Sequence, residues 1–148
     1  MLEIRFAARL VLLDADHRVL LFKHGDGYGR LFWATPGGGV EEGESTEQAA
    51  RREASEELGA KQVDLVPLWT GHTNFNFADR SVSQSEAFFL IQNHSGVLGS
   101  EVEETHRRER IVEIRWWSLD EIVKSGEVIY PLDLAARLGD YLRGAERR

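Results

Sequence analysis

The chain of 148 residues contains no cysteine, only three prolines and one methionine, and no long run of apolar residues. The lack of cysteine excludes disulfide bonds, cysteine-ligated zinc and catalysis by a thiol nucleophile. Basic residues are also few, with 18 Lys and Arg against 25 Asp and Glu, for a formal net charge of −7. This charge disfavours binding to long nucleic acid, because contact with a phosphate backbone needs a broad basic face. The apolar runs are too short to span a membrane.

The remaining composition is that of a folded soluble protein. Hydrophobic residues make up 42% of the chain and charged residues 29%, which excludes disordered and collagen-like classes. At about 150 residues per domain, the length predicts a single domain over residues 1–148. Charges at Glu3, Arg5 and Arg9 interrupt what would be the apolar part of a signal peptide, so we expect a cytoplasmic protein.

Apolar and turn-forming residues alternate along the chain as in an α/β domain. Apolar runs at 10–13 and 19–22, separated by a polar stretch, indicate two strands joined as a hairpin. A brief strand at 31–34 ends before Pro36, since proline lacks a donor for the ladder. Strands around a central helix, with helices at the end, predict an α/β layered domain. The other expected elements are strands at 63–69, 86–92 and 110–118, a polar loop between the first two of these, and helices at 120–124 and 132–142.

The central helix is predicted to begin at Ser45. Ser45 and Gln48 form a capping box, in which each side chain bonds to the backbone of the other residue. Glu47 adds negative charge to the first turn, which the helix dipole favours there. Gly59 is the natural stop, because glycine tolerates the left-handed conformation that ends a helix.

Three carboxylates crowd one turn of this helix. Ala50, Ala54 and Leu58 form its buried stripe, and the carboxylates lie three and four residues apart on the adjoining face. Each exposed pair costs roughly a few tenths of a kcal/mol through repulsion. A divalent cation removes this cost, since Mg²⁺ binds carboxylates together with substrate phosphate oxygens. The alternative is a solvated acidic surface. The three residues are Glu53, Glu56 and Glu57.

The loop before the helix favours the metal site. Gly37-Gly38-Gly39 follows Pro36 and lets the backbone approach a ligand closely. Its carbonyls and amides can therefore reach a metal or a phosphate. A glycine loop joined to a capped helix with an acidic triplet describes a phosphate site built around a metal.

Seven residues between the glycine loop and the end of the helix have a spacing that resembles the Nudix box. Seven fixed residues would coincide by chance in about one in a million chains of this length. Ala54 and Ala60 depart from the pattern, which usually has a larger aliphatic residue there, although alanine still suits a buried stripe. The segments 33–39 and 115–121 are also similar to bacterial Nudix hydrolases. The resemblance implies a MutT-like Nudix fold, an α/β/α sandwich with a mixed sheet between helices. The matching residues are Gly38, Glu44, Arg52, Glu53, Glu56, Glu57 and Gly59.

The resemblance also implies the chemistry, which is cleavage of a pyrophosphate bond in a nucleoside diphosphate linked to another moiety by a metal-activated water. Glu53, Glu56 and Glu57, with the carbonyl of Gly37, would hold Mg²⁺ or alternatively Mn²⁺. Arg52 would orient the carboxylates, and Glu44 would hold the loop against the helix. The general base would be one of the three box carboxylates or a glutamate outside the box. Outside the box we rank Glu109 first, ahead of Glu86, Glu103, Glu104 and Glu113.

Substrate contacts are expected from aromatic faces, from lone arginines and from the backbone of the glycine loop. Phe75 and Phe77 lie in the expected polar loop, where burial does not explain them easily. Trp33 is a further candidate for stacking on a base, although its short apolar strand favours core packing. The remaining candidates are His72 for stacking and Gly38, Arg9 and Arg80 for the phosphates.

Several substrates and functions stay open at this point. A nucleoside triphosphate, a dinucleoside polyphosphate, an NDP-sugar and an RNA 5′ end all agree with the motif, whereas Pro67 lies too close to the box for the ADP-ribose branch. A nucleotide sensor without catalysis is the main alternative, but a sensor has no need for three carboxylates. A prenyl diphosphate isomerase is disfavoured, because that branch uses a cysteine. A homodimer agrees with the resemblance, since Nudix enzymes are often dimers.

Overall fold

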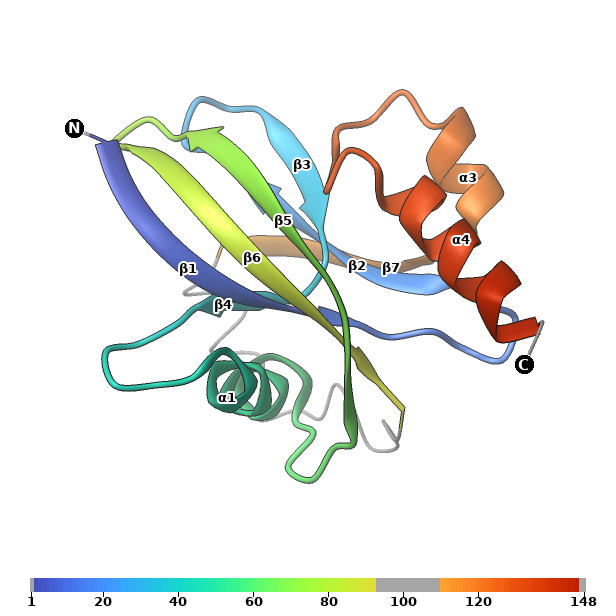
Figure 1. The fold of residues 1–148 in the computed structure, drawn as a ribbon. Coiled ribbons are helices and arrows are strands. Elements are labelled where there is room, and N and C mark those ends of the chain that lie inside the picture. Colours follow the sequence, from blue (N-terminus) through green and yellow to red (C-terminus); the bar gives the residue numbers. More distant parts are fainter. Residues whose placement is uncertain (1, 93–109, 147–148) are drawn as a thin grey trace.

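Two four-stranded sheets and the helices that flank them make up the computed structural model, which describes residues 2–92 and 110–146 (Figure 1). The strand order is β4-β1-β6-β5 in the first sheet and β7-β2-β3-β8 in the second. The elements are β1 (Leu2–Val11), β2 (Val19–Gly25), β3 (Leu31–Ala34), β4 (Gly37–Gly39), α1 (Thr46–Leu58), β5 (Leu65–Asn76), β6 (Ser81–Ile91), β7 (Ile111–Trp117), α3 (Leu119–Lys124), β8 (Ile129–Tyr130) and α4 (Leu134–Glu146).

Both sheets contain parallel and antiparallel ladders. β1 pairs in parallel with β6 and antiparallel with β4, while β5 and β6 are antiparallel. In the second sheet β3 and β8 are parallel, and β2 is antiparallel to β3 and β7. The prediction of mixed pairing is therefore confirmed, with the strands divided between two sheets.

Helix α1 covers one side of both sheets. Its residues Ala49, Ala50, Ala54 and Leu58 are fully buried in a cluster with β1, β2 and β6. Small side chains allow the helix to approach the strands closely, so the alanine at position 54 completes the contact rather than weakening it. Ala60 lies in the same cluster, which explains both departures from the usual motif by core packing.

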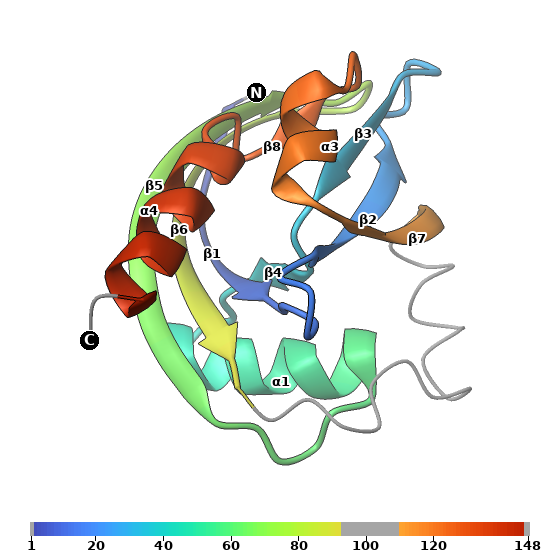
Figure 2. The same ribbon diagram turned by 90° about the vertical axis from the view of Figure 1, so that its right-hand side faces the viewer.

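Helices α3 and α4 cover the opposite side (Figure 1), and Figure 2 shows the same separation from a second direction. Leu134 and Leu138 of α4 pack in a cluster that includes Trp33 and Trp117. The two indole rings meet edge to face with their centroids 5.1 Å apart, a favourable geometry for aromatic pairs. This arrangement confirms the predicted α/β/α sandwich. None of the helices in the described ranges is long and apolar enough to cross a membrane.

The predicted hairpin between the first two strands forms only next to its turn, where Leu13 and Val19 are antiparallel and Asp14 N–H donates to the Arg18 carbonyl. β1 and β2 belong to different sheets, and an isolated bridge between Leu13 and Val19 connects them. The turn itself is local, because the Asp14 carboxylate accepts the backbone N–H groups of Asp16 and Arg18. The turn-forming residues thus predicted the reversal of the chain correctly, but they do not indicate which sheet each strand joins.

The polar loop expected before residue 86 is largely strand. β5 continues to Asn76 and β6 begins at Ser81. Polar residues such as Asn74 and Asn76 are exposed on one face, while Phe75 points to the other face and is only 8% exposed. An antiparallel pair with one solvated face has this alternation. The prediction failed because a half-solvated strand was interpreted as a loop.

The ends of α1 agree with the sequence. Ser45 is the N-cap, and its side chain and that of Gln48 form both bonds of the capping box. Gly59 ends the helix in the left-handed conformation, with φ 70°. Local hydrogen bonding fixes both ends of the helix that presents the three carboxylates.

Gly37 occupies a position that no other residue fits. Its φ is +133°, and a Cβ at this position would lie 2.1 Å from the carbonyl oxygen of Ala8. We expect Gly37→Ala to lower the free energy of unfolding by about 2–3 kcal/mol, measured by urea denaturation. Gly43→Ala is the matched control, because Gly43 also has a positive φ but has open space around it. Equal losses in the two variants would show that the contact with β1 is unimportant.

Candidate active site

Arg52 organises the acidic face of α1. Its guanidinium donates to both Glu44 oxygens at 2.9 and 3.0 Å and to a Glu53 oxygen at 2.8 Å. It also donates to Glu56 at 3.3 Å and to the Gly39 carbonyl at 2.8 Å. The bonds to Glu44 and Glu53 raise the pKa of Arg52 further above its ordinary value, against the opposing effect of burial. The side chain is therefore a permanent cation that ties the loop before α1 to the helix carboxylates.

The glycine loop and the helix meet at two further carboxylate contacts. The backbone N–H of Gly37 donates to Glu57 Oε2 at 3.0 Å, and Glu57 is only 2% exposed. Glu53 is 6% exposed, and its Oε1 lies 2.5 Å from the place where a Cβ of Gly38 would stand. Glycine at position 38 therefore leaves the space that the Glu53 carboxylate occupies.

The donor chemistry of this face fits a hard divalent cation. Three glutamate side chains and the backbone carbonyls of the glycine loop offer the oxygen ligands that Mg²⁺ prefers. Over residues 2–92 and 110–146, no three acidic or histidine side chains are already arranged to coordinate a metal ion. Glu53 and Glu56 instead bond to Arg52, and Glu57 bonds to Gly37.

Glu44 makes the stability of this face depend on pH. The Arg52 hydrogen bond, with a smaller contribution from the Glu41 backbone N–H, holds the pKa of the Glu44 carboxyl below its ordinary value of 4.5, and burial opposes the shift. A depressed pKa in the folded state adds stability above the unfolded pKa, and this stability is lost as the pH falls through the folded pKa.

Comparing wild type with Glu44→Gln tests this dependence. We expect wild type to be the more stable at neutral pH and the difference to shrink as the pH falls below about 4.5, measured by urea unfolding. Glu47→Gln, at an exposed position of α1, serves as the control variant. A difference between wild type and Glu44→Gln that stays constant down to about pH 3 would contradict the assignment.

A cleft of about 270 Å³ opens beside Gly37 and Gly38, between the two sheets. Among the residues that the structure describes, Asp79 is the single acidic residue on its wall. The arginines come from β1, from the β5–β6 turn and from the position before β7, so the cleft is basic although the chain is acidic. A concave basic wall concentrates anions. The cleft arginines are Arg5, Arg9, Arg80 and Arg110.

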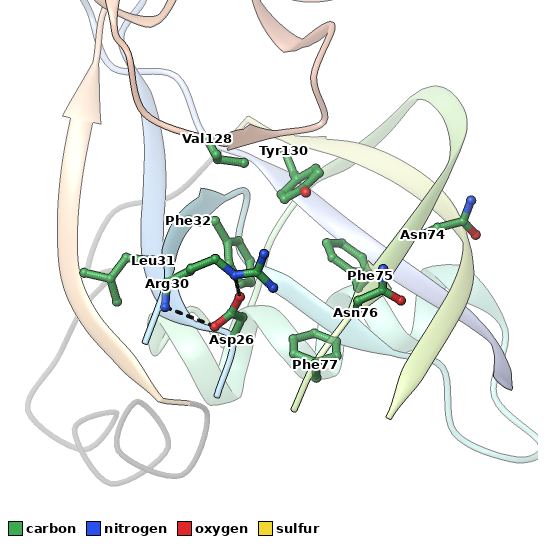
Figure 3. A pocket seen from close by; sticks show the side chains of 10 residues that line it. All are labelled: Asp26, Arg30, Leu31, Phe32, Asn74, Phe75, Asn76, Phe77, Val128 and Tyr130. Carbon is green, nitrogen blue, oxygen red and sulfur yellow. Dashed lines mark hydrogen bonds and ion pairs between the residues drawn. The ribbon is translucent and has the colours of Figure 1, made fainter. Parts of the chain in front are cut away.

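A second cavity, of about 210 Å³, lies beside the cleft (Figure 3). The two cavities share Phe32, Phe75 and Phe77 as wall residues. Phe32 and Phe75 each meet the ring of Tyr130 edge to face, with centroids 5.6 and 5.1 Å apart. The Asp26–Arg30 ion pair on the rim, 2.7 Å long, leaves this aromatic cavity without net charge.

The structure corrects the prediction for Trp33. The ring is 2% exposed, lies in the core beneath α4 and donates to Glu127 at 3.0 Å. It therefore offers no face for stacking. Its neighbour Phe32, on the other face of β3, lines both cavities. Alternation along a strand places Trp33 and Phe32 on opposite faces, but it does not tell which face meets the core.

The other predicted substrate residues are divided between the cleft and the outer surface. Phe75, Phe77, Arg9, Arg80 and Gly38 line the cleft, and the Arg80 guanidinium lies over the Phe77 ring. Sequence reasoning did not single out Arg5, Arg110, Phe32 or Tyr130. His72 does not join the cleft residues but bonds to Ser83 and Ser85, and Glu113 pairs with Lys23. Glu103, Glu104 and Glu109 lie outside the described residues.

Fold and site together define an α/β/α domain with an acidic helix face beside an arginine-lined cleft. A family model described as the NUDIX domain matches residues 3–137, and the chain belongs to the Nudix hydrolase family.

Among relatives, the RNA pyrophosphohydrolase of Caulobacter vibrioides is 28% identical over 132 residues, which cover 82% of this chain and 74% of that protein. That of Aeromonas hydrophila is 33% identical over 98 residues, covering 59% of this chain and 54% of the relative. The nucleoside triphosphatase NudI of Salmonella typhimurium is 38% identical over 85 residues, which cover 54% of this chain and 59% of that protein. Matches to the last two therefore span little more than half of each relative.

Solved structures confirm the fold. A Caenorhabditis elegans Ap4A hydrolase has a TM-score of 0.66 at 21% identity, covering 95% of this chain and 98% of that one. A MutT Nudix hydrolase from Burkholderia pseudomallei has a TM-score of 0.65 at 23% identity, covering 90% and 95%.

Proposed function

We propose that the protein is a Mg²⁺-dependent hydrolase that cleaves a pyrophosphate bond in a nucleotide. The observation that carries this proposal is the junction at Gly37 and Gly38, where the acidic face of α1 meets the arginine-lined cleft. Cleavage of a diphosphate needs a site for cations and a site for phosphates next to each other. The names of the RNA pyrophosphohydrolase and nucleoside triphosphatase relatives support the same class of reaction.

Glu53, Glu56 and Glu57, with the Gly37 carbonyl, would hold Mg²⁺, and Mn²⁺ would be accepted in its place. When bound, the ion neutralises the diphosphate and lowers the pKa of a bound water. The chain itself supplies the orientation. Arg52 holds Glu53 and Glu56 from one side, and the Gly37 backbone N–H holds Glu57 from the other.

The cleft would take the phosphates and the aromatic cavity would take the base. The four arginines suit a substrate with a highly charged polyphosphate group. This favours nucleoside triphosphates, dinucleoside polyphosphates and RNA 5′-triphosphate ends over NDP-sugars. The aromatic cavity is smaller than the range of about 300–1,000 Å³ typical of pockets for drug-sized ligands. It therefore suits one uncharged ring system, stacked against Phe75 or Phe77.

Two parts of the chemistry stay as predictions. Glu109 remains our first candidate for a general base outside the box. The alternative to hydrolysis is a sensor that binds nucleotides without cleaving them. The buried Glu57 argues against the sensor, because burying a carboxylate costs free energy that simple nucleotide binding does not require.

A panel of nucleotides incubated with Mg²⁺ tests the proposal by product analysis. It should contain dNTPs, 8-oxo-dGTP, NDP-sugars, ADP-ribose, diadenosine polyphosphates and a 5′-triphosphorylated RNA oligonucleotide. We expect metal-dependent cleavage of a polyphosphate substrate that is abolished by EDTA. Binding of nucleotides without cleavage of any of them would favour the sensor.

A further inference from the structure

A buried ion pair crosses the wall of the cleft. Arg9 of β1 and Glu86 of β6 come from neighbouring parallel strands, and Arg9 Nε donates to Glu86 Oε2 at 2.8 Å. Glu86 is 6% exposed. Neither the capping signals nor the Nudix motif includes this glutamate, and burying a carboxylate at such a place needs an explanation.

Glu86 accepts three hydrogen bonds. Besides Arg9, Gln84 Nε2 donates to Oε2 at 2.9 Å and Thr73 Oγ1 donates to Oε1 at 3.0 Å. The three donors come from β1, β6 and β5, so the carboxylate is fixed from three directions. A carboxylate held in this way is poorly placed to remove a proton from water, which argues against Glu86 as the general base.

The far end of Arg9 reaches the glycine loop. Arg9 Nη1 donates to the carbonyls of Thr35 at 3.3 Å and Gly37 at 3.4 Å. Arginine has five N–H donors, and these contacts use Nε and Nη1. Among the described residues the Nη2 hydrogens have no hydrogen-bond partner, and Arg9 lines the cleft with Gly37 and Gly38. Within the part of the chain that the structure describes, the Nη2 edge of the guanidinium is thus available where the phosphates are proposed to bind.

We propose that Glu86 is a positioning residue that holds Arg9, so that Nη2 receives a phosphate oxygen of the substrate. An unrestrained arginine side chain loses conformational entropy when it binds an anion, and ordering it beforehand removes that cost. The carboxylate also offsets repulsion between Arg9 and Arg5, which line the same cleft. The inference rests on the proposed function only in that phosphates must occupy the cleft.

Binding of inorganic tripolyphosphate, measured by calorimetric titration, tests this role without requiring turnover. We expect Glu86→Gln to raise the Kd by about tenfold, and Arg9→Gln by at least as much, because charge-assisted hydrogen bonds to phosphate are lost. Since Glu86 acts through Arg9, the double variant should bind no more weakly than Arg9→Gln alone. A purely structural role predicts instead that the two effects add.

Two further variants keep the test decisive. Glu127→Gln is the matched control, because it removes a carboxylate that pairs with Lys23 away from the cleft, and it should leave the Kd unchanged. If Glu86→Gln fails to fold, Thr73→Val removes one support of Glu86 and should raise the Kd to a smaller extent. An unchanged Kd in the folded Glu86 or Thr73 variant, additive losses in the double variant, or no tripolyphosphate binding by wild type overturns the inference. Tripolyphosphate binding without hydrolysis in the nucleotide panel defeats only the proposed function.

Discussion

Glu57→Gln is expected to reduce Mg²⁺-dependent turnover by at least about 100-fold while the protein stays folded. Glu57 is buried and accepts the Gly37 backbone N–H at 3.0 Å. A glutamine keeps the size of the side chain and an oxygen that can accept this bond, so the glycine loop should keep its place. The lost charge, in contrast, removes a ligand that a hard cation prefers.

The measurement is a steady-state rate with the best substrate from the nucleotide panel, together with a thermal melt in the absence of metal. We expect the melting temperature to remain the same or to rise, because repulsion among the three carboxylates falls. Glu47→Gln on an exposed part of the same helix is the control and should leave the rate unchanged. Wild-type turnover by Glu57→Gln with Mg²⁺ would falsify the assignment of a metal ligand.

Arg52→Ala should cause a large loss of stability, about 3 kcal/mol in the free energy of unfolding. The guanidinium bonds to Glu44, Glu53 and the Gly39 carbonyl, and its removal leaves the nearly buried Glu53 carboxylate without this cation. For a protein of this size the change corresponds to a fall of roughly 10 °C in melting temperature. Turnover should fall as well, since Glu53 and Glu56 lose their common support.

Arg51→Ala is the matched control for this variant. Arg51 is the preceding residue of α1, where its side chain is more exposed, pairs with Glu47 and donates to the Val63 carbonyl at 2.7 Å. Arg51→Ala removes an exposed ion pair and one hydrogen bond but leaves no buried carboxylate without its cation, so the control should lose less stability than Arg52→Ala. Similar losses in the two variants would indicate a general effect of helix charge in place of a specific role for Arg52.

Sequence analysis succeeded where the signal is local. The capping box at Ser45, the stop at Gly59 and the carboxylate spacing all lie within one helix, and the structure places that helix as expected. The glycine loop was identified for the same reason. Its need for glycine at position 37 arises from β1, however, since the clash involves Ala8.

Long-range pairing was the part that the sequence did not reveal. The cleft brings together arginines from β1, from the β5–β6 turn and from the position before β7. The sequence suggested Arg9 and Arg80 singly, but it did not reveal their grouping with two further arginines. Glu86 resembled a surface glutamate, because its partners Arg9 and Thr73 are distant in the sequence. The choice between Trp33 and Phe32 depended on which face of β3 meets the core, and an apolar run of four residues does not decide that.

The pairing of β1 with β6 has a consequence for the order in which the chain acquires structure during synthesis. Leu2 is paired with Ser81 and Val11 with Leu90, so β1, which is synthesised before the other described strands, waits for one of the later strands. Contacts between residues so distant in sequence slow folding, because a long loop must close first. Until then the nascent chain exposes the apolar side chains of β1, and β4, which follows much sooner, is the first described strand that can pair with it.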